Sequence, residues 1–280
     1  MALGKFHALF RAAHPEPGLA VTTVSALLAA GAGHTFGRGA LITATVLASQ
    51  AAVGWSNDWL DARRDRAVGR PDKPVATGAV SRTAVGVAAA VSALAVPVIG
   101  LFTTLPGAAC ITLALVSALL YNAPLKRTAF SVLPYVVSFG ALPAFVVLAL
   151  PGAPTPPLWL VLAGGLIGGG AHFANVLPDL EDDLTTGVRG LPHRIGATAS
   201  RIAAAVLLLG ATVTLAFGPP GPPSWVGIAA LAAAALTLPA GWLAARAATA
   251  RGQRSHAAFR SVIAVALIDV VLLVAGGSVG

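Results

Sequence analysis

The sequence predicts an all-α integral membrane protein whose helices form a single bundle. Hydrophobic residues make up 56% of the 280 positions and charged residues only 10%, whereas soluble proteins carry about 25% charged residues. The apolar residues come in long runs, and each run approaches the roughly 20 residues that a transmembrane helix needs. No polar stretch between the runs is long enough to bury a core of its own. We therefore expect one transmembrane domain over residues 1–280.

The apolar runs predict a bundle of nine transmembrane helices. The predicted spans cover approximately residues 17–33, 38–56, 84–103, 105–122, 130–150, 157–177, 200–217, 224–245 and 258–277. The first and seventh spans are short. The first ten residues include Lys5 and His7 and contain no apolar run of signal-peptide length, so we expect no cleaved leader. Small residues such as GGLIGGGA at 164–171 are typical of closely packed membrane helices.

The net charge of +8 is distributed unevenly along the chain. With a cytoplasmic N-terminus, the cytoplasmic side receives the basic residues of segments 5–11, 63–82, 126–127, 189–201 and 246–260. Only Arg38 falls on the opposite side, and the outer connections at 103–105, 151–156 and 218–223 contain no Lys or Arg. This asymmetry follows the positive-inside rule and predicts a multi-pass protein of the cell membrane with its C-terminus outside. Because topology explains the charge, we expect the lipid bilayer and no nucleic acid as a partner.

Two acidic segments follow the same pattern at the ends of the second and sixth predicted spans. The first acidic segment, residues 57–65, reads NDWLDARRD and contains Asn57, Asp58, Asp61 and Asp65. The second acidic segment, residues 175–183, reads NVLPDLEDD and contains Asn175, Asp179 and Asp183, with Glu181 and Asp182 between them. Both lie on the predicted cytoplasmic side. Each precedes a comparatively long polar loop, at 66–81 and at 184–200, and such loops often carry function, for example as lids.

The spacing of the aspartates predicts a metal site. Intervals of three and four residues place Asp58, Asp61 and Asp65 on one face of a continued helix. Carboxylates crowded at the end of a membrane helix repel one another and lose hydration, which is costly unless a cation joins them. Oxygen ligands without a cysteine pair or a histidine cluster favour Mg²⁺ over Zn²⁺. Mg²⁺ in turn prefers a few carboxylates together with phosphate oxygens, so a diphosphate substrate fits this site.

Basic residues interleaved with the acidic segments offer further charge to a diphosphate. They are Arg63, Arg64, Arg66, Arg70, Lys73, Lys126, Arg127, Arg189 and Arg194. For each of them taken alone, the positive-inside rule is the more common explanation, except for Arg70 and Lys126, which lie within motifs. The alternative interpretation of the acidic segments is a solvated loop in which the carboxylates pair with these arginines.

Three short segments together resemble the UbiA superfamily of intramembrane prenyltransferases. NDWLDARRD followed by GRPDKPVATG is similar to the first signature of that family, which continues through Arg70, Pro71 and Gly78. Asp179, Asp183 and Gly187 are similar to the second signature, and YNAPLKR resembles the family element that contains Tyr121 and Lys126. The resemblance implies a helical bundle around a central cavity, with the two acidic segments facing each other and binding diphosphate through Mg²⁺.

The resemblance and the residue chemistry together define the expected site. The metal ligands would be Asn57, Asp58, Asp61, Asp65, Asp179 and Asp183, of which Asp58, Asp61, Asp179 and Asp183 are also expected to be catalytic. The diphosphate would contact Asn57, Arg70, Lys73, Lys126 and Arg189. Tyr121 and Asn175 are assigned to the pocket for the prenyl group or its cation, where aromatic faces can stabilise positive charge. Further aromatic candidates are Trp55, Tyr135, Phe139 and Phe173, although packing explains each of them.

Three functions remain open at this point. The resemblance implies a prenyltransferase that ionises a prenyl diphosphate and passes the prenyl group to a small lipophilic acceptor. A terpene cyclase would share the ionisation without an acceptor, and a transporter would release no diphosphate. His14 and His172 are candidate bases, with a structural role the more common explanation for a lone histidine. Asp269 lies within the last predicted span, where a carboxylate is costly and suggests function, although no family motif includes it.

Overall fold

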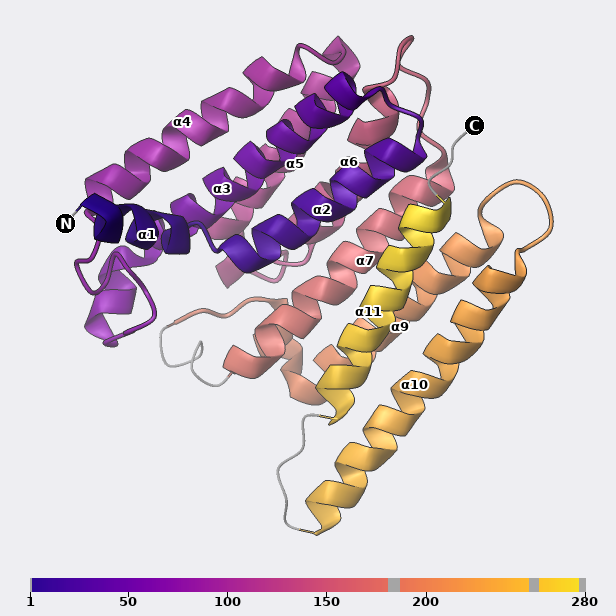
Figure 1. Ribbon diagram of the computed structural model, residues 1–280. Helices are drawn as coiled ribbons and strands as arrows, with labels where there is room; N and C mark the ends of the chain where they lie inside the picture. Colours follow the sequence, from indigo (N-terminus) through magenta and orange to yellow (C-terminus); the bar gives the residue numbers. More distant parts are fainter. Residues whose placement is uncertain (1, 181–186, 252–256, 277–280) are drawn as a thin grey trace. The chain divides into compact units, whose positions relative to one another are not determined.

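The computed structural model describes residues 2–180, 187–251 and 257–276, and within these ranges every regular element is a helix (Figure 1). The chain divides into two compact units, which are described separately. The first unit comprises Met1–Pro124 with Phe145–Thr155, and the second comprises Leu125–Ala144 with Pro156–Gly280.

The first unit is built around one long helix. Its helices are α1 (Ala2–Ala12), α2 (Pro15–Gly31), α3 (Phe36–Ala67), α4 (Arg82–Gly100) and α5 (Leu105–Asn122). Helix α3 packs against α2, α4 and α5, and the short α1 contacts α2, α3 and α4 (Figure 1). The connection between α3 and α4 therefore begins and ends on two helices that lie side by side.

The end of helix α6 (Leu133–Leu148) also belongs to the first unit, where side chains of that unit cap its carbonyl groups. Arg38 Nη1 donates to the carbonyl oxygen of Ala149 at 2.7 Å, and Thr104 Oγ1 donates to that of Leu148 at 2.6 Å. The His34 ring nitrogen Nε2 lies 2.8 Å from the carbonyl oxygen of Val146. The last carbonyls of a helix have no partner within the helix, and a cation there also complements the helix dipole. Arg38, the single basic residue on the predicted outer side, thus has a structural role.

The second unit contains the remaining helices. They are the 3₁₀ turn η1 (Leu125–Arg127), most of α6, α7 (Leu158–Val176), the 3₁₀ turn η2 (Leu177–Asp179), α9 (Leu191–Phe217), α10 (Trp225–Ala250) and α11 (Ala257–Gly276). Helix α9 contacts α7, α10 and α11, and α11 also contacts α7 and α10. Helices α6 and α7 approach closely, because a Cβ atom on Gly164 would lie only 2.6 Å from the carbonyl oxygen of Phe139. The small residues of α7 serve helix packing, as their pattern indicates.

The predicted count of nine membrane spans is not confirmed. Each predicted run overlaps a helix, but in the described part of the chain only α4, α5, α7, α9 and α10 are long and apolar enough to cross a bilayer. Helix α6 is apolar but has only 16 residues, and α2 has only 17. Helix α3 continues past its apolar part to Ala67 through the charged first acidic segment.

The outer surface of these helices suits a bilayer. On α4, the side chains of Val87, Val91, Leu94 and Val98 are 57–69% exposed and recur every three or four residues along one face. A continuous apolar face of this kind is unfavourable in water and favourable in hydrocarbon. The protein is therefore an integral membrane protein with an all-helical fold.

Candidate active site

The first acidic segment lies on a buried face of α3. Asp58, Asp61 and Asp65 are only 1–4% exposed, and all three belong to the same helix at intervals of three and four residues. Lysine and arginine side chains lie next to these carboxylates. Such pairing is needed because burying an unpaired carboxylate costs a large amount of free energy. The three carboxylates are therefore not part of a solvated loop, although the pairing with arginine that the alternative interpretation expected does occur at Asp61 and Asp65.

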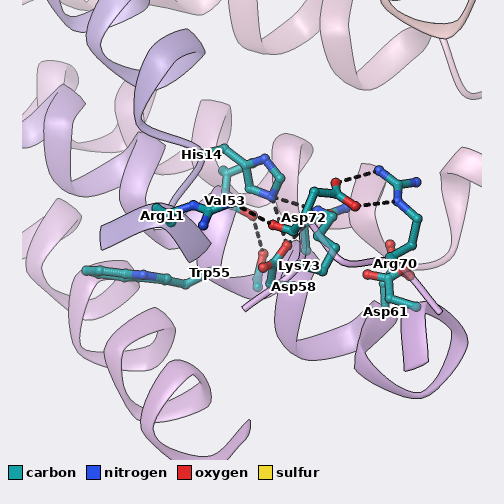
Figure 2. A network of polar contacts seen from close by, with 12 residues as sticks. Arg11, His14, Val53, Trp55, Asp58, Asp61, Arg70, Asp72 and Lys73 are labelled. Atoms are coloured by element: carbon teal, nitrogen blue, oxygen red, sulfur yellow. Dashed lines mark hydrogen bonds and ion pairs between the residues drawn. The ribbon is translucent and has the colours of Figure 1, made fainter. Parts of the chain in front are cut away.

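The Asp58 carboxylate is contacted by two nitrogen atoms (Figure 2). Lys73 Nζ donates to Asp58 Oδ1 at 2.7 Å, and His14 Nε2 lies 2.8 Å from the same oxygen. Lys73 Nζ and His14 Nε2 are themselves 3.0 Å apart. The second oxygen, Oδ2, is buried and has no hydrogen-bond partner among the described residues. One oxygen of the carboxylate is thus crowded with donors while the other has none.

Asp61 and Asp65 share one guanidinium. Arg64 Nη2 lies 3.1 Å from Asp61 Oδ2 and 3.5 Å from Asp65 Oδ1. Because the Arg64 side chain is only 24% exposed, its charge compensates these carboxylates in partly dehydrated surroundings. Arg64 therefore offsets part of the negative charge on the acidic face of α3.

The loop after α3 carries two basic residues, Arg70 and Lys73, of which Lys73 points toward this face. Its hydrogen bonds include Arg70 N to the carbonyl oxygen of Asp65, and Gly69 and Gly78 adopt left-handed backbone conformations that favour glycine. Lys73 points inward to Asp58 and is 13% exposed. Arg70 instead binds Asp72 through Nε and Nη2 at 2.9 and 2.8 Å on the exposed side of the loop. This pairing lowers the pKa of the Asp72 carboxyl to about 2.

Asn57 joins the acidic segment to the end of α5. Its Nδ2 donates to Asn122 Oδ1 at 3.3 Å, and Asn122 Nδ2 donates to Ser56 Oγ at 2.6 Å and to the carbonyl oxygen of Val53 at 2.9 Å. Tyr121, the neighbour of Asn122 on α5, is half-buried. Asn57 thus uses one of its two amide N–H donors in packing, and its carbonyl oxygen would be the atom that meets a metal.

The second unit holds the other predicted site residues, and the structure brings only part of them together. Asn175 Nδ2 donates to the hydroxyl of Tyr135 at 3.4 Å, and the Tyr135 ring lies 5.0 Å from the ring of His172 between centroids. Lys126 is buried in η1, whereas the Arg189 side chain is exposed.

The second acidic segment is described only in part. The backbone of Asp179 ends the turn η2, directly after α7. Glu181, Asp182 and Asp183 lie outside the described residues, as does the start of the following loop to residue 186. Because the two acidic segments belong to different units, their facing each other across a cavity stays a prediction.

The donor set of the first acidic segment fits a divalent cation. Within the described residues, no three His, Cys, Asp or Glu side chains converge as a ready-made metal site. However, Asp58 Oδ2 is a buried anionic oxygen with no partner in that part of the chain, and such an atom is costly unless a cation or donor meets it. Carboxylate oxygens with an amide carbonyl nearby are also ligands that Mg²⁺ accepts.

Sequence reasoning missed two residues of this arrangement and did not place a third. His14 was singled out as a candidate base, but it lies 44 positions before Asp58, and nothing in the sequence indicates that the two are in contact. Asn122 and Asp72 were not singled out, although Asp72 lies within the loop motif that contains Arg70 and Lys73. The alternation of opposite charges at Arg70, Asp72 and Lys73 was the one available signal.

In the second unit, His172 and Asp269 have structural partners. Ser131 Oγ lies 3.0 Å from His172 Nε2 and accepts a hydrogen bond from Leu191 N at 2.8 Å. Thr212 Oγ1 donates to Asp269 Oδ1 at 2.6 Å within the bundle. Both side chains are almost completely buried. His172 therefore connects α7 to the start of α9, and Asp269 connects α11 to α9.

Comparison with known proteins identifies the family. The family model of the UbiA prenyltransferase family matches residues 18–266. Comparison with the curated proteins gave no significant match. Several solved structures share the fold, at sequence identities too low to indicate more than the fold.

Three of these structures cover nearly the whole chain. A structure of digeranylgeranylglyceryl phosphate synthase is 16% identical, with a TM-score of 0.70 over 98% of this chain and 99% of that chain. A UbiA homologue from Archaeoglobus fulgidus bound to DMAPP and Mg²⁺ is 13% identical, with a TM-score of 0.69 over 97% and 99% of the two chains. The apo structure of a UbiA homologue from Aeropyrum pernix K1 is 19% identical, with a TM-score of 0.64 over 97% and 98%. Since the family model spans most of the sequence and these folds agree with it, the chain belongs to the UbiA prenyltransferase family.

Proposed function

We propose that this protein is a Mg²⁺-dependent intramembrane prenyltransferase, which ionises a prenyl diphosphate and transfers the prenyl group to an aromatic or other small lipophilic acceptor. The observation that carries the proposal is the buried carboxylate face of α3, in which Asp58 Oδ2 has no partner among the described residues. Family membership and the homologue of the same fold bound to DMAPP and Mg²⁺ support it.

The metal would be held by the first acidic segment together with the second. We assign Asn57, Asp58, Asp61, Asp65, Asp179 and Asp183 as ligands. When bound, Mg²⁺ would supply positive charge to the departing diphosphate. The chain itself contributes three carboxylates on one helix face, of which Asp61 and Asp65 would have to exchange their pairing with Arg64 for the ion.

Basic side chains would bind the diphosphate oxygens. Lys73 lies at the edge of the carboxylate face, and Arg70 is carried by the same loop. Lys126, Arg189 and the amide of Asn57 complete the proposed set. Arg70 would have to exchange its two hydrogen bonds with Asp72 for bonds to the substrate, which an exposed ion pair allows at little cost.

In the proposed reaction, the allylic C–O bond breaks and both of its electrons leave with the diphosphate. The apolar helices exclude water from the resulting carbocation, and aromatic rings such as Tyr121 would stabilise its charge. Asn175 is assigned to the same pocket. The acceptor then forms a bond to the cation and loses a proton, so that the products are the prenylated acceptor and diphosphate.

The proposed orientation follows the distribution of basic residues. The N-terminus and both acidic segments would lie on the cytoplasmic side, and the C-terminus outside. A water-soluble diphosphate could then be released directly into the cytoplasm.

Product analysis tests the reaction class. Purified protein is incubated with Mg²⁺ and C10, C15 or C20 prenyl diphosphate, with and without a panel of lipophilic acceptors, and the products are identified by mass spectrometry. We expect prenylated acceptor and diphosphate only when an acceptor is present. A cyclic terpene formed without an acceptor would instead identify a cyclase, and no diphosphate release under any condition would refute both.

The variant Asp58→Ala links this reaction to the site. We expect turnover to fall by at least about a hundredfold, as is usual when a catalytic charge is removed, while the protein stays folded in the membrane. Glu16→Gln, which neutralises an exposed carboxylate on α2, is the matched control and should keep full activity. Unchanged turnover in Asp58→Ala would refute the assigned site.

A further inference from the structure

His14 lies at the junction of α1 and α2 in an unusual backbone conformation. Its φ of 53° and ψ of 63° are left-handed, which only a few per cent of residues other than glycine adopt. Such a conformation costs about 1–3 kcal/mol and persists only where the surrounding structure holds it. The junction must therefore be fixed by its neighbours.

Two contacts with α3 fix the junction. A Cβ atom on Gly54 would lie 2.6 Å from the carbonyl carbon of Ala13, so only glycine allows the junction to lie directly on α3. Trp55 Nε1 donates to the carbonyl oxygen of Leu9 at 2.8 Å and holds α1 in place. Gly54 precedes Asp58 by four residues, about one helical turn. The absence of a side chain at position 54 thus brings the His14 ring to Asp58.

The two carboxylate oxygens of Asp58 have different surroundings. His14 Nε2 and Lys73 Nζ both lie within 2.8 Å of Oδ1, whereas Oδ2 is buried without a partner among the described residues. An ionised carboxylate accepts hydrogen bonds or metal ions at both oxygens. With Oδ1 occupied from the side of His14 and the loop, Oδ2 is the oxygen left for a cation (Figure 2).

We propose that His14 is a positioning residue for the metal: together with Lys73 it engages Oδ1 of Asp58, fixes the plane of the carboxylate and leaves Oδ2 for the divalent cation. The inference rests on the proposed function, in which Asp58 is a metal ligand. His14 itself is neither a ligand nor in contact with substrate. Hydrogen-bond partners of metal-ligating groups set the orientation of those groups, and their loss typically weakens metal binding about 10–100-fold.

Substitutions of His14 can separate the imidazole from the backbone. His14→Gly and His14→Asn both tolerate the left-handed backbone but cannot reach Asp58. His14→Gln places an amide nitrogen at about the same reach as Nε2 and can restore the hydrogen bond. His7→Ala on α1 removes an exposed histidine from the same region and is the matched control.

Binding of Mn²⁺ alone, followed by the loss of the free-ion signal in electron paramagnetic resonance, measures the effect without turnover. We expect His14→Gly and His14→Asn to bind Mn²⁺ at least about tenfold more weakly, and His14→Gln to lie within about threefold of the wild type. His7→Ala should bind as the wild type does. Thermal unfolding of each variant in detergent shows whether it remains folded.

The outcomes distinguish this inference from the proposed function. If the Asp58→Asn variant binds Mn²⁺ as tightly as the wild-type protein does, the proposed metal site is wrong. If Asp58→Asn does weaken Mn²⁺ binding but folded His14→Gly or His14→Asn binds as the wild type does, only the role of His14 is wrong. A His14→Gln variant as weak as His14→Gly would also overturn that role, because the hydrogen bond would then not be the cause.

Discussion

At the scale of single residues, basic side chains of the same unit partly compensate the acidic face of α3. Arg64 serves Asp61 and Asp65, while Lys73 and His14 serve one oxygen of Asp58. Buried carboxylates of like charge would otherwise repel one another and destabilise the helix. Basic side chains of the protein therefore stabilise the buried carboxylates of the proposed metal site. Asp58 Oδ2 is the buried oxygen without a partner among the described residues.

The ion pair of Arg70 and Asp72 predicts a specific pH dependence. Arg70 lowers the pKa of Asp72 from 3.8 to about 2, so the stabilisation is complete above about pH 4 and is lost as the pH falls from 3.8 toward 2. We expect Asp72→Asn to lower the free energy of unfolding by no more than about 1 kcal/mol, because the pair is exposed. The difference should be constant between about pH 5 and pH 8 and should vanish in stronger acid.

Thermal unfolding of wild type and Asp72→Asn, monitored by tryptophan fluorescence over this pH range, checks the prediction. Glu16→Gln provides the comparison for loss of an exposed carboxylate on α2. A stability difference that grows on acidification would contradict the sign argued here, since protonated Asp72 cannot pair with Arg70.

At the scale of elements, the packing of α6 against α7 depends on missing side chains. A Cβ atom on Gly164 would lie 2.6 Å from the carbonyl oxygen of Phe139 and 3.0 Å from Pro143 Cγ. We expect Gly164→Ala to destabilise the protein by about 1–3 kcal/mol, because the two helices must move apart. Gly39→Ala on α3 has no atom within 4 Å of its new methyl group and should be neutral or stabilising by up to about 1 kcal/mol.

Unfolding of the two variants in detergent measures this contrast. Equal stability of Gly164→Ala and Gly39→Ala would show that α6 and α7 are not held at close range. Because both substitutions add the same methyl group to a helix, intrinsic helix propensity cannot produce the difference.

Element boundaries show what hydropathy can and cannot predict. The apolar runs placed α5 and α7 to within one or two residues, because those helices end where their apolar sequence ends. Helix α3 continues to Ala67, supported by the pairing of Arg64 with Asp61 at three residues' spacing. Helix α9 begins at Leu191, before the predicted apolar run, and is interrupted at Gly196 with a φ of 81°. Hydropathy thus predicts which part of a helix lies in an apolar environment. It does not predict where the helix ends, because that depends on backbone and side-chain hydrogen bonds.

At the scale of the whole molecule, the asymmetric charge predicts the orientation in the membrane. In a Cys110→Ala background, a cysteine at Ala79 in the loop after α3 should react with a membrane-impermeant maleimide only when the cytoplasmic side is accessible. A cysteine at Thr155, in the connection without Lys or Arg, should react from the outside of intact cells. Labelling of both positions from the same side would refute the predicted topology.

The sequence by itself determined that the protein lies in a lipid bilayer, that its fold is all-helical, and to which family it belongs. Composition and apolar runs indicate a helical membrane protein, and the spacing of Asp58, Asp61 and Asp65 indicates a shared helix face, because these properties depend on residues close together in the chain. The motifs around Arg70, Tyr121 and Asp179 indicated the family that the family model shows.

Only the tertiary structure decided which groups meet Asp58. His14 and Lys73 reach it from 44 and 15 residues away, through a backbone approach at Gly54 that no local pattern announces. It also decided that Arg38 caps α6 and that Asn57 binds Asn122. Such contacts depend on how segments far apart in the sequence pack together. Hydropathy and motif spacing describe only residues close together in the chain, so they cannot predict these contacts.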